Sequence, residues 1–309
     1  MSVPAAYICL VLTWSTTPLA VQWSADGVGF SFAVLSRMLV SVALAVALLA
    51  LWRKPLPFHP RARALYLVSG VSLFVAMSLV YWAAGEVRSG LISVIFGLSP
   101  LLTSLIAALW RAEPPPGRRA LAGIALAIAG LAAIFVRGDD GADGTAGLLA
   151  LLLAALVHSA SLVMLKRIGG DNPPLATTLG TLLVALPMFA LQWWLGDGTL
   201  PADPPARAIG AILYLGVFGS LLSFTLYYYV IKHLAASQVA LVTLMTPVLA
   251  LVLGQQVNGE VLDARVWLGS ALVLLGLALH QWLALRRLLP IRRRRRVAPE
   301  VAASEQAVE

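Results

Sequence analysis

The chain has 309 residues, of which 60% are hydrophobic and only 12% are Asp, Glu, Lys or Arg. An average soluble domain carries about 25% charged and about 45–50% apolar residues, so this composition argues against a soluble enzyme, a nucleic-acid-binding protein and a disordered scaffold. It is typical of a membrane protein, and the net charge of +8 has to be explained by where the basic residues lie along the chain.

Apolar stretches long enough to cross a bilayer recur along the whole chain. A transmembrane helix needs about 20 mostly apolar residues. Polar or Pro/Gly-rich breaks separate ten such stretches, which cover approximately residues 4–23, 30–52, 64–84, 89–110, 119–136, 145–166, 174–195, 207–231, 236–257 and 265–285. Because lipid offers the backbone no hydrogen-bond partners, segments of this kind cross as helices. The sequence predicts an all-α polytopic membrane protein with ten transmembrane helices.

The first stretch has no basic segment before it and no convincing small-residue cleavage site after it. We therefore expect a retained first helix rather than a cleaved signal peptide. The stretch contains Cys9, the single cysteine of the chain, which excludes an intramolecular disulfide and a cysteine-based zinc cluster. We predict no metal site and no cofactor.

The Lys and Arg residues divide unequally between alternate breaks. Seventeen of the 22 fall on the side that carries both termini, four fall on the other side, and Arg37 lies inside the second span. Cytoplasmic loops carry the excess of basic residues, which predicts a multi-pass protein of the cell inner (plasma) membrane with both termini cytoplasmic. A charge inside a span is costly, so Arg37 either snorkels to the outer interface or lines a cavity.

The two halves of the chain resemble each other at an offset of 147 residues. The aligned pairs are Tyr81-Trp82 with Tyr228-Tyr229, Ser99-Pro100 with Thr246-Pro247, Glu113 with Glu260 and, more weakly and at a different offset, Trp14-Ser15 with His158-Ser159. Each half holds five spans, and since five is odd, the second half enters the membrane from the opposite side. The prediction is two inverted five-helix repeats, residues 1–137 and 145–286, followed by a basic, disordered cytoplasmic tail over 287–309. Inverted repeats are a recurring transporter architecture.

Polar, aromatic and proline residues inside the spans are candidates for a substrate cavity or its gates. They are Trp14, Arg37, Tyr81, Ser93, Ser99, Pro100, His158, Tyr228, Thr243, Thr246 and Pro247. The two prolines kink their helices beside a cavity or simply help helices to pack, and the hydroxyls before them could satisfy the freed carbonyls. The tyrosines gate the cavity or join aromatic belts at the membrane surface. His158 binds substrate or titrates near neutral pH, or is a neutral histidine bonded inside the bundle.

Two glutamates and four glycines have expected structural roles. Glu113 and Glu260 each precede the next predicted helix, where a carboxylate favours the positive end of the helix dipole; carrying protons is the alternative. Gly123 and Gly130 are spaced by seven, as are Gly269 and Gly276, so each pair shares one helical face. These faces allow the fifth and tenth helices to pack closely on a neighbour.

The features that point to a known family are Arg37, the two hydroxyl-proline steps, the two glutamates and the glycine pairs. In these features the chain resembles the ten-span, two-repeat EamA transporters of the drug/metabolite transporter superfamily. The resemblance covers about residues 4–285. The resemblance implies export. The first span departs from the usual Trp-Gly step, because Trp14 is followed by Ser15-Thr16-Thr17-Pro18. The chain also lacks the intramembrane Glu of the smaller multidrug relatives, which argues against carboxylate-coupled drug/proton exchange.

The expected function is that of a secondary transporter that moves a small organic metabolite, such as an amino acid, a derivative or an amphipathic drug, by alternating access. No Asp or Glu lies inside a predicted span and no Walker A motif is present, so we expect neither enzymatic activity nor ATP-driven transport. The alternative is a non-transporting membrane scaffold or assembly protein with a fully packed centre. The expected partners are a small-molecule solute and anionic lipid headgroups at Arg292–Arg296, with no nucleic acid, in a monomer or homodimer.

Overall fold

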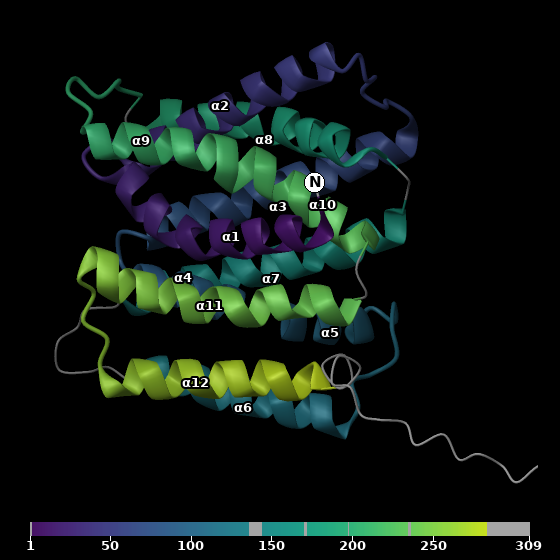
Figure 1. Ribbon diagram of the computed structural model, residues 1–309, viewed down its shortest axis with the longest axis vertical. Helices are drawn as coiled ribbons and strands as arrows, with labels where there is room; N and C mark the ends of the chain where they lie inside the picture. The colour runs from purple at the N-terminus through teal and green to yellow at the C-terminus, as the bar shows by residue number, and fades with distance from the viewer. Residues whose placement is uncertain (1, 136–143, 170–171, 197, 234–235, 283–309) are drawn as a thin grey trace, which may run out of the picture.

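The computed structural model describes residues 2–135, 144–169, 172–196, 198–233 and 236–282, and the regular elements in these ranges are all helices (Figure 1). Within them, the side chains of residues 135, 228, 231–233, 236–241, 243 and 244 are not described. The predicted tail and its basic cluster Arg292–Arg296 lie outside the described residues.

The first half of the chain forms α1 (Val3–Ala25), α2 (Phe30–Leu51), α3 (Pro60–Ala83), α4 (Ser89–Phe96), α5 (Ser99–Leu109) and α6 (Arg118–Phe135). The second half forms α7 (Thr145–Ile168), α8 (Pro174–Gly196), α9 (Ala206–Tyr214), the π-helix η1 (Leu215–Leu222), α10 (Ser223–His233), α11 (Ala236–Asn258) and α12 (Ala264–His280). Every predicted span overlaps one of these helices or a consecutive group of them.

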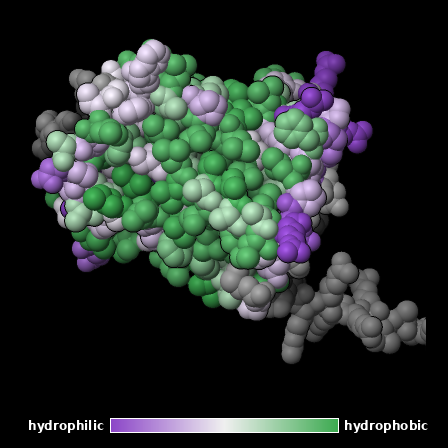
Figure 2. Space-filling view, turned by 90° about the horizontal axis from the view of Figure 1, so that it is seen from above, coloured by the Kyte–Doolittle hydropathy of each residue, from purple (hydrophilic) through white to green (hydrophobic). Residues whose placement is uncertain are grey.

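Seven helices among the described residues are long and apolar enough to cross a membrane, and α12 is a shorter apolar helix. This pattern supports a multi-pass membrane protein, while the count of ten crossings stays a prediction. Figure 2 shows apolar residues over the middle of the visible face and hydrophilic residues gathered toward its left and right ends. The helices run between these two ends, as expected for a protein whose middle lies in hydrocarbon.

The long helices run across Figure 1, so that the α11–α12 connection lies at the left and the α5–α6 connection at the right. We call these two ends of the bundle the Glu260 end and the Glu113 end, after the glutamate in each connection. Helix α3 packs on both α7 and α8, and α2 packs on α8. Helices α6 and α12 pack mainly on each other at the lower edge of the picture.

The contact between α6 and α12, which we call the glycine seam, is made by backbone. A Cβ added to Gly123 would lie 2.5 Å from the carbonyl oxygen of Gly276, and one added to Gly130 would lie 2.5 Å from that of Gly269. The reverse additions meet the carbonyls of Gly130 and Gly123. Because Gly123 faces Gly276 while Gly130 faces Gly269, the two helices run antiparallel. The glycines on each helix therefore have the glycines of the other helix as their neighbours.

Two of the predicted spans are interrupted. In the fourth, α4 ends at Phe96 and α5 begins at Ser99, because Pro100 has no amide proton to donate to the carbonyl of Phe96. Pro247, its counterpart in the repeat alignment, lies inside the continuous helix α11. The eighth span is interrupted by η1, which separates α9 from α10.

Candidate functional site

Arg37 on α2 is 3% exposed, although it carries a full charge. Its Nε donates to Ser220 Oγ at 2.8 Å, its Nη2 donates to the carbonyl of Gly219 at 3.0 Å, and its Nη1 donates to the hydroxyl of Tyr81 at 3.4 Å. The guanidinium also lies 6.0 Å from the centroid of the Tyr81 ring. Arg37 therefore points into the bundle and does not snorkel to an interface.

The π-helix η1 provides the acceptors for this arginine. A π-helix pairs each carbonyl with the amide five residues ahead, so its turns are wider than those of an α-helix. The carbonyl of Gly219 accepts from Arg37, and that of Gly216 accepts from Ser41 Oγ at 2.9 Å. A Cβ at Gly216 would meet Val40 side-chain atoms at 2.6–2.7 Å, so glycine lets η1 approach α2 this closely. The contact joins the two halves of the chain.

Within the described part of the chain, Arg37 contacts hydroxyls, a carbonyl and an aromatic ring but no carboxylate. A guanidinium has five N–H donors, and the described contacts use three of them. A buried charge without a counter-charge is costly, and π-helical turns occur frequently at functional sites. The arrangement can bind an anionic or carbonyl group of a solute that reaches Arg37.

The break between α4 and α5 lies against Pro247 of α11. A Cβ at Gly97, between α4 and α5, would lie 3.3 Å from Pro247 Cγ of α11. Thr246 and Ser93 are buried nearby on α11 and α4. Ser99 Oγ is buried without a hydrogen-bond partner among the described atoms, so it does not satisfy a carbonyl freed by Pro100. That expectation was wrong for Ser99.

The remaining cavity candidates occupy separate places. His158 on α7 faces Phe96 with ring centroids 6.2 Å apart, and the adjacent Ser159 donates to the carbonyl of Ser99 at 3.2 Å. Trp14 packs on Tyr227 of α10 with centroids 5.3 Å apart. The Tyr81 side chain is 1% exposed and its hydroxyl accepts from Arg37. Tyr81 therefore lies inside the bundle and not in an aromatic belt at the membrane surface. The side chains of Tyr228 and Thr243 lie outside the described residues.

Glu260 lies at a helix N-terminus, but not at that of the helix that follows it. The N-cap of α12 is Asp263, whose side chain accepts from the Val266 amide at 2.8 Å. Glu260 instead reaches α4, where it accepts from the Ser89 amide and hydroxyl. Asp263 is closer in sequence to α12, so it caps that helix and leaves Glu260 free to face α4. The expectation that Glu260 would face the following helix was wrong.

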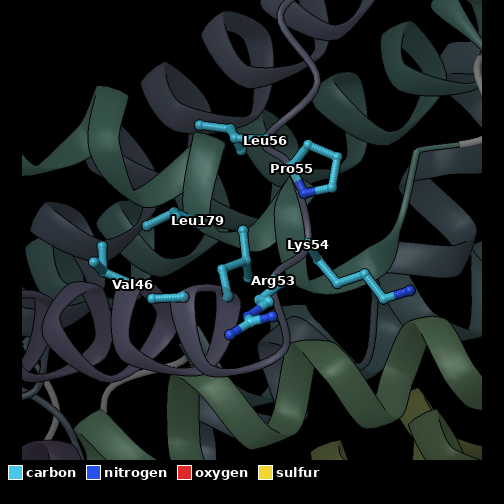
Figure 3. A pocket seen from close by; sticks show the side chains of 8 residues that line it. Val46, Arg53, Lys54, Pro55, Leu56 and Leu179 are labelled. Atoms are coloured by element: carbon cyan, nitrogen blue, oxygen red, sulfur yellow. The ribbon is translucent and has the colours of Figure 1, made fainter.

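Sequence reasoning missed the partners of Arg37 and a groove at the Glu113 end. Ser220 and Gly219 were not candidates, although Gly-Ser pairs inside an apolar span are a recognisable site of helix distortion. The groove has a volume of about 440 Å³ and is lined by Val46, Leu49, Ala50, Arg53, Lys54, Pro55, Leu56 and Leu179 (Figure 3). None of the predicted cavity residues lines it.

Comparisons with known proteins agree on one class. The sequence profile of the EamA-like transporter family matches residues 3–136 and 145–280. The chain is 29% identical over 286 residues to a "Probable terminal-alkyne amino-acid exporter" of Streptantibioticus cattleyicolor, covering 89% of this chain and 91% of that protein. It is 25% identical over 296 residues to protein PagO of Salmonella typhimurium, covering 94% of this chain and 95% of that protein.

Two further similarities concern location and fold. This chain is 24% identical over 278 residues to an inner membrane transporter of Escherichia coli, YedA, and the alignment covers 89% of each protein. A solved crystal structure superposes with a TM-score of 0.64 at 21% identity, covering 93% of this chain and 99% of that one. At this identity the superposition shows a shared fold.

Proposed function

Because the chain belongs to the EamA-like transporter family, we propose that it is a secondary transporter that exports a small organic metabolite across the inner membrane by alternating access. Two of the relatives described above are named as an exporter and a transporter. Amino acids and their derivatives are the first candidate substrates, since one relative is named as an amino-acid exporter. The observation that carries the proposal is Arg37, a buried cation that joins α2 to η1 without contacting a described carboxylate.

The proposed architecture is ten transmembrane helices in two inverted repeats, residues 1–137 and 145–286, with both termini cytoplasmic. Two observations support it. The amide of Glu113 donates to the carbonyl of Ala107 at 3.2 Å, and the amide of Glu260 donates to the carbonyl of Gly254 at 3.1 Å, so the same turn recurs at the offset of 147 residues. The antiparallel glycine seam is the contact expected where two inverted repeats meet.

In the proposed transport path, Arg37 binds the solute and the proline steps allow α4, α5 and α11 to bend. Discontinuous helices that expose backbone carbonyls at a binding site recur in secondary transporters, and η1 supplies such carbonyls beside Arg37. Tyr81, Ser93, Ser99, Pro100, His158, Thr246 and Pro247 are the other proposed path residues, together with Trp14, Tyr228 and Thr243. The proposed partners remain the solute and, at Arg292–Arg296, anionic lipid, in a monomer or homodimer.

The test is solute counterflow in proteoliposomes. Purified protein is reconstituted in liposomes preloaded with one member of a panel of amino acids and derivatives, and entry of the labelled solute is measured. At least one member is expected to enter faster than in protein-free liposomes and to be competed by its unlabelled form. The proposal fails if no panel member, including amphipathic drugs, enters faster than in protein-free liposomes. That result would favour the alternative of a membrane scaffold.

A further inference from the structure

Helices α2 and α5 both end in the sequence Ala-Leu-Trp-Arg, which covers residues 50–53 and 108–111. In each copy the arginine has a positive φ, 50° for Arg53 and 55° for Arg111. The amide of the arginine and the amide after it both bond back to carbonyls in the last turn of the helix. This is a Schellman motif, and the residue at its left-handed position is usually glycine.

Arginine is an unfavourable residue for this backbone. A left-handed conformation brings the Cβ of an L-residue close to the next carbonyl oxygen, whereas glycine adopts it without that clash. The other five positive-φ positions among the described residues are all glycines. A role for Arg53 and Arg111 has therefore to be sought in their side chains.

The two helix ends differ in what lies beside them. At the end of α5, Arg167 of α7 donates to the carbonyl of Trp110, and its guanidinium lies 5.7 Å from the centroid of the Trp110 ring. At the end of α2, Trp52 is exposed, and neither Arg53 nor Lys54 pairs with a carboxylate of the described ranges. The end of α2 borders the groove of about 440 Å³ instead.

This groove is basic at one end and apolar along the rest (Figure 3). Val46, Leu49 and Arg53 recur at helical spacing, so they line it from one face of α2. Because Arg53 is seven positions after Val46, the apolar floor leads back along α2 from the arginine for about 10 Å. Leu179 of α8 contributes to the same lining. The volume lies within the range of small-molecule sites, about 300–1,000 Å³.

The charge around the groove selects the kind of ligand that fits it. The connection over residues 52–63 contains no Asp or Glu and four basic residues, Arg53, Lys54, Arg61 and Arg63. A second groove of about 430 Å³, beside Cys9 and Tyr214, has no charged residue in its lining. Tryptophans such as Trp52 collect at the membrane surface, which places the basic end of the first groove at the level of the lipid headgroups. Its charge and shape complement an anionic amphiphile.

We propose that this groove binds an anionic phospholipid of the membrane. Arg53 and Lys54 hold the headgroup phosphate, and an acyl chain lies along the apolar floor. The planar guanidinium suits this role, since it donates two parallel hydrogen bonds to phosphate oxygens. The site is separate from Arg292–Arg296 and goes beyond the proposed transport function. The bound lipid fixes the end of α2, the helix that carries Arg37.

Native mass spectrometry of the purified full chain tests the site without a transported solute. The chain in detergent is titrated with phosphatidylglycerol and, separately, with phosphatidylcholine of the same acyl chains. Phosphatidylglycerol is expected to bind at least about tenfold more tightly, because its headgroup carries a net negative charge. Arg53→Gln/Lys54→Gln should weaken its binding by about 25-fold, since each basic residue near an anionic surface contributes about fivefold. Equal affinities of the unmodified chain for the two lipids would overturn the proposal.

The matched control is Arg61→Gln/Arg63→Gln, which removes the same charge from the same connection at exposed positions outside the groove. It is expected to weaken phosphatidylglycerol binding by less than about twofold, because salt screens exposed charges that do not touch the headgroup. If the two double variants lose the same affinity, the lipid is attracted by the basic surface as a whole and the groove is not its site.

Arg53→Gly separates binding from folding. Glycine adopts a φ of 50° without strain, so the lipid-free variant should unfold at the same or a higher temperature. It should bind phosphatidylglycerol about fivefold more weakly, and undiminished binding would remove Arg53 from the site.

Inorganic phosphate distinguishes a lipid site from a site for free anions. An excess of phosphate is expected to leave phosphatidylglycerol bound, since phosphate lacks the acyl chain that the apolar floor contacts. If phosphate displaces the lipid, the groove binds free anions and the phospholipid proposal is wrong.

Discussion

The Gly123→Ala variant is expected to be destabilised, although it adds only one methyl group. The added Cβ would lie 2.5 Å from the carbonyl oxygen of Gly276 and 2.8 Å from the amide nitrogen of His280. Both are backbone atoms of α12 and cannot rotate away, so the two helices must separate. Overpacking of this kind costs about 1–3 kcal/mol. The unfolding temperature of the purified protein in detergent should fall by about 2–5 °C.

The control for this prediction is the same substitution at Gly210 on α9. A Cβ there meets nothing within 4 Å, and the residue is exposed. Alanine has a higher helix propensity than glycine, so Gly210→Ala should be neutral or stabilising by up to about 1 kcal/mol. Equal unfolding temperatures for the two variants would show that the glycine seam is not closely packed.

The second large effect is expected on transport and not on stability. Arg37→Leu removes a buried charge that has no described counter-charge and replaces it with an apolar side chain. Removing the charge relieves the cost of its burial, while the Gly219 carbonyl and the Ser220 hydroxyl each lose a donor at a cost of about 1–3 kcal/mol. Because the two effects oppose each other, the variant should fold with an unfolding temperature within a few degrees of that of the unmodified protein. Counterflow should fall by about tenfold or more, because the variant loses the hydrogen bond between the solute and the charged guanidinium, and hydrogen bonds to charged groups are the stronger ones. Arg37→Lys should also lose most of the flux, since it cannot reproduce the planar guanidinium.

Arg63→Ala is the matched control, because Arg63 is an exposed arginine near the start of α3. Its flux is expected to stay within about twofold of the unmodified protein, since surface charges contribute little. Loss of both folding and flux in Arg37→Leu would assign Arg37 a structural role. Retention of full flux in a folded Arg37→Leu protein would remove it from the transport path.

Much of the helix framework could be predicted from hydropathy. Apolar stretches in lipid have to be helical, and the short polar breaks mark where they end. The family was also confirmed, since its profile matches the regions that the motifs identified. The seven-residue spacing of Gly123 and Gly130 predicted a close-packed face. It could not identify Gly276 and Gly269 as the partners, because spacing defines a face and not its neighbour.

The interactions around Arg37 and Glu260 could not be predicted because they depend on distant pairs. Arg37 and Ser220 are separated by 183 positions, and the π-helical turn that presents Ser220 is not visible in an apolar pattern. For Glu260, the next helix along the chain is α12, whereas the helix whose N-terminus it contacts is α4. Both cases show that a charged residue inside or between spans identifies a place of interest, while its partner is determined by how the helices pack.

The glycine seam also bears on how this chain can be divided. Its contacts are reciprocal, since Gly123 and Gly130 meet the carbonyls of Gly276 and Gly269 and are met by the same pair in return. Each half thus presents an edge that complements the other half. A chain cut between residues 137 and 145, with the two pieces produced separately, therefore retains a specific surface on which the pieces can reassociate in the bilayer.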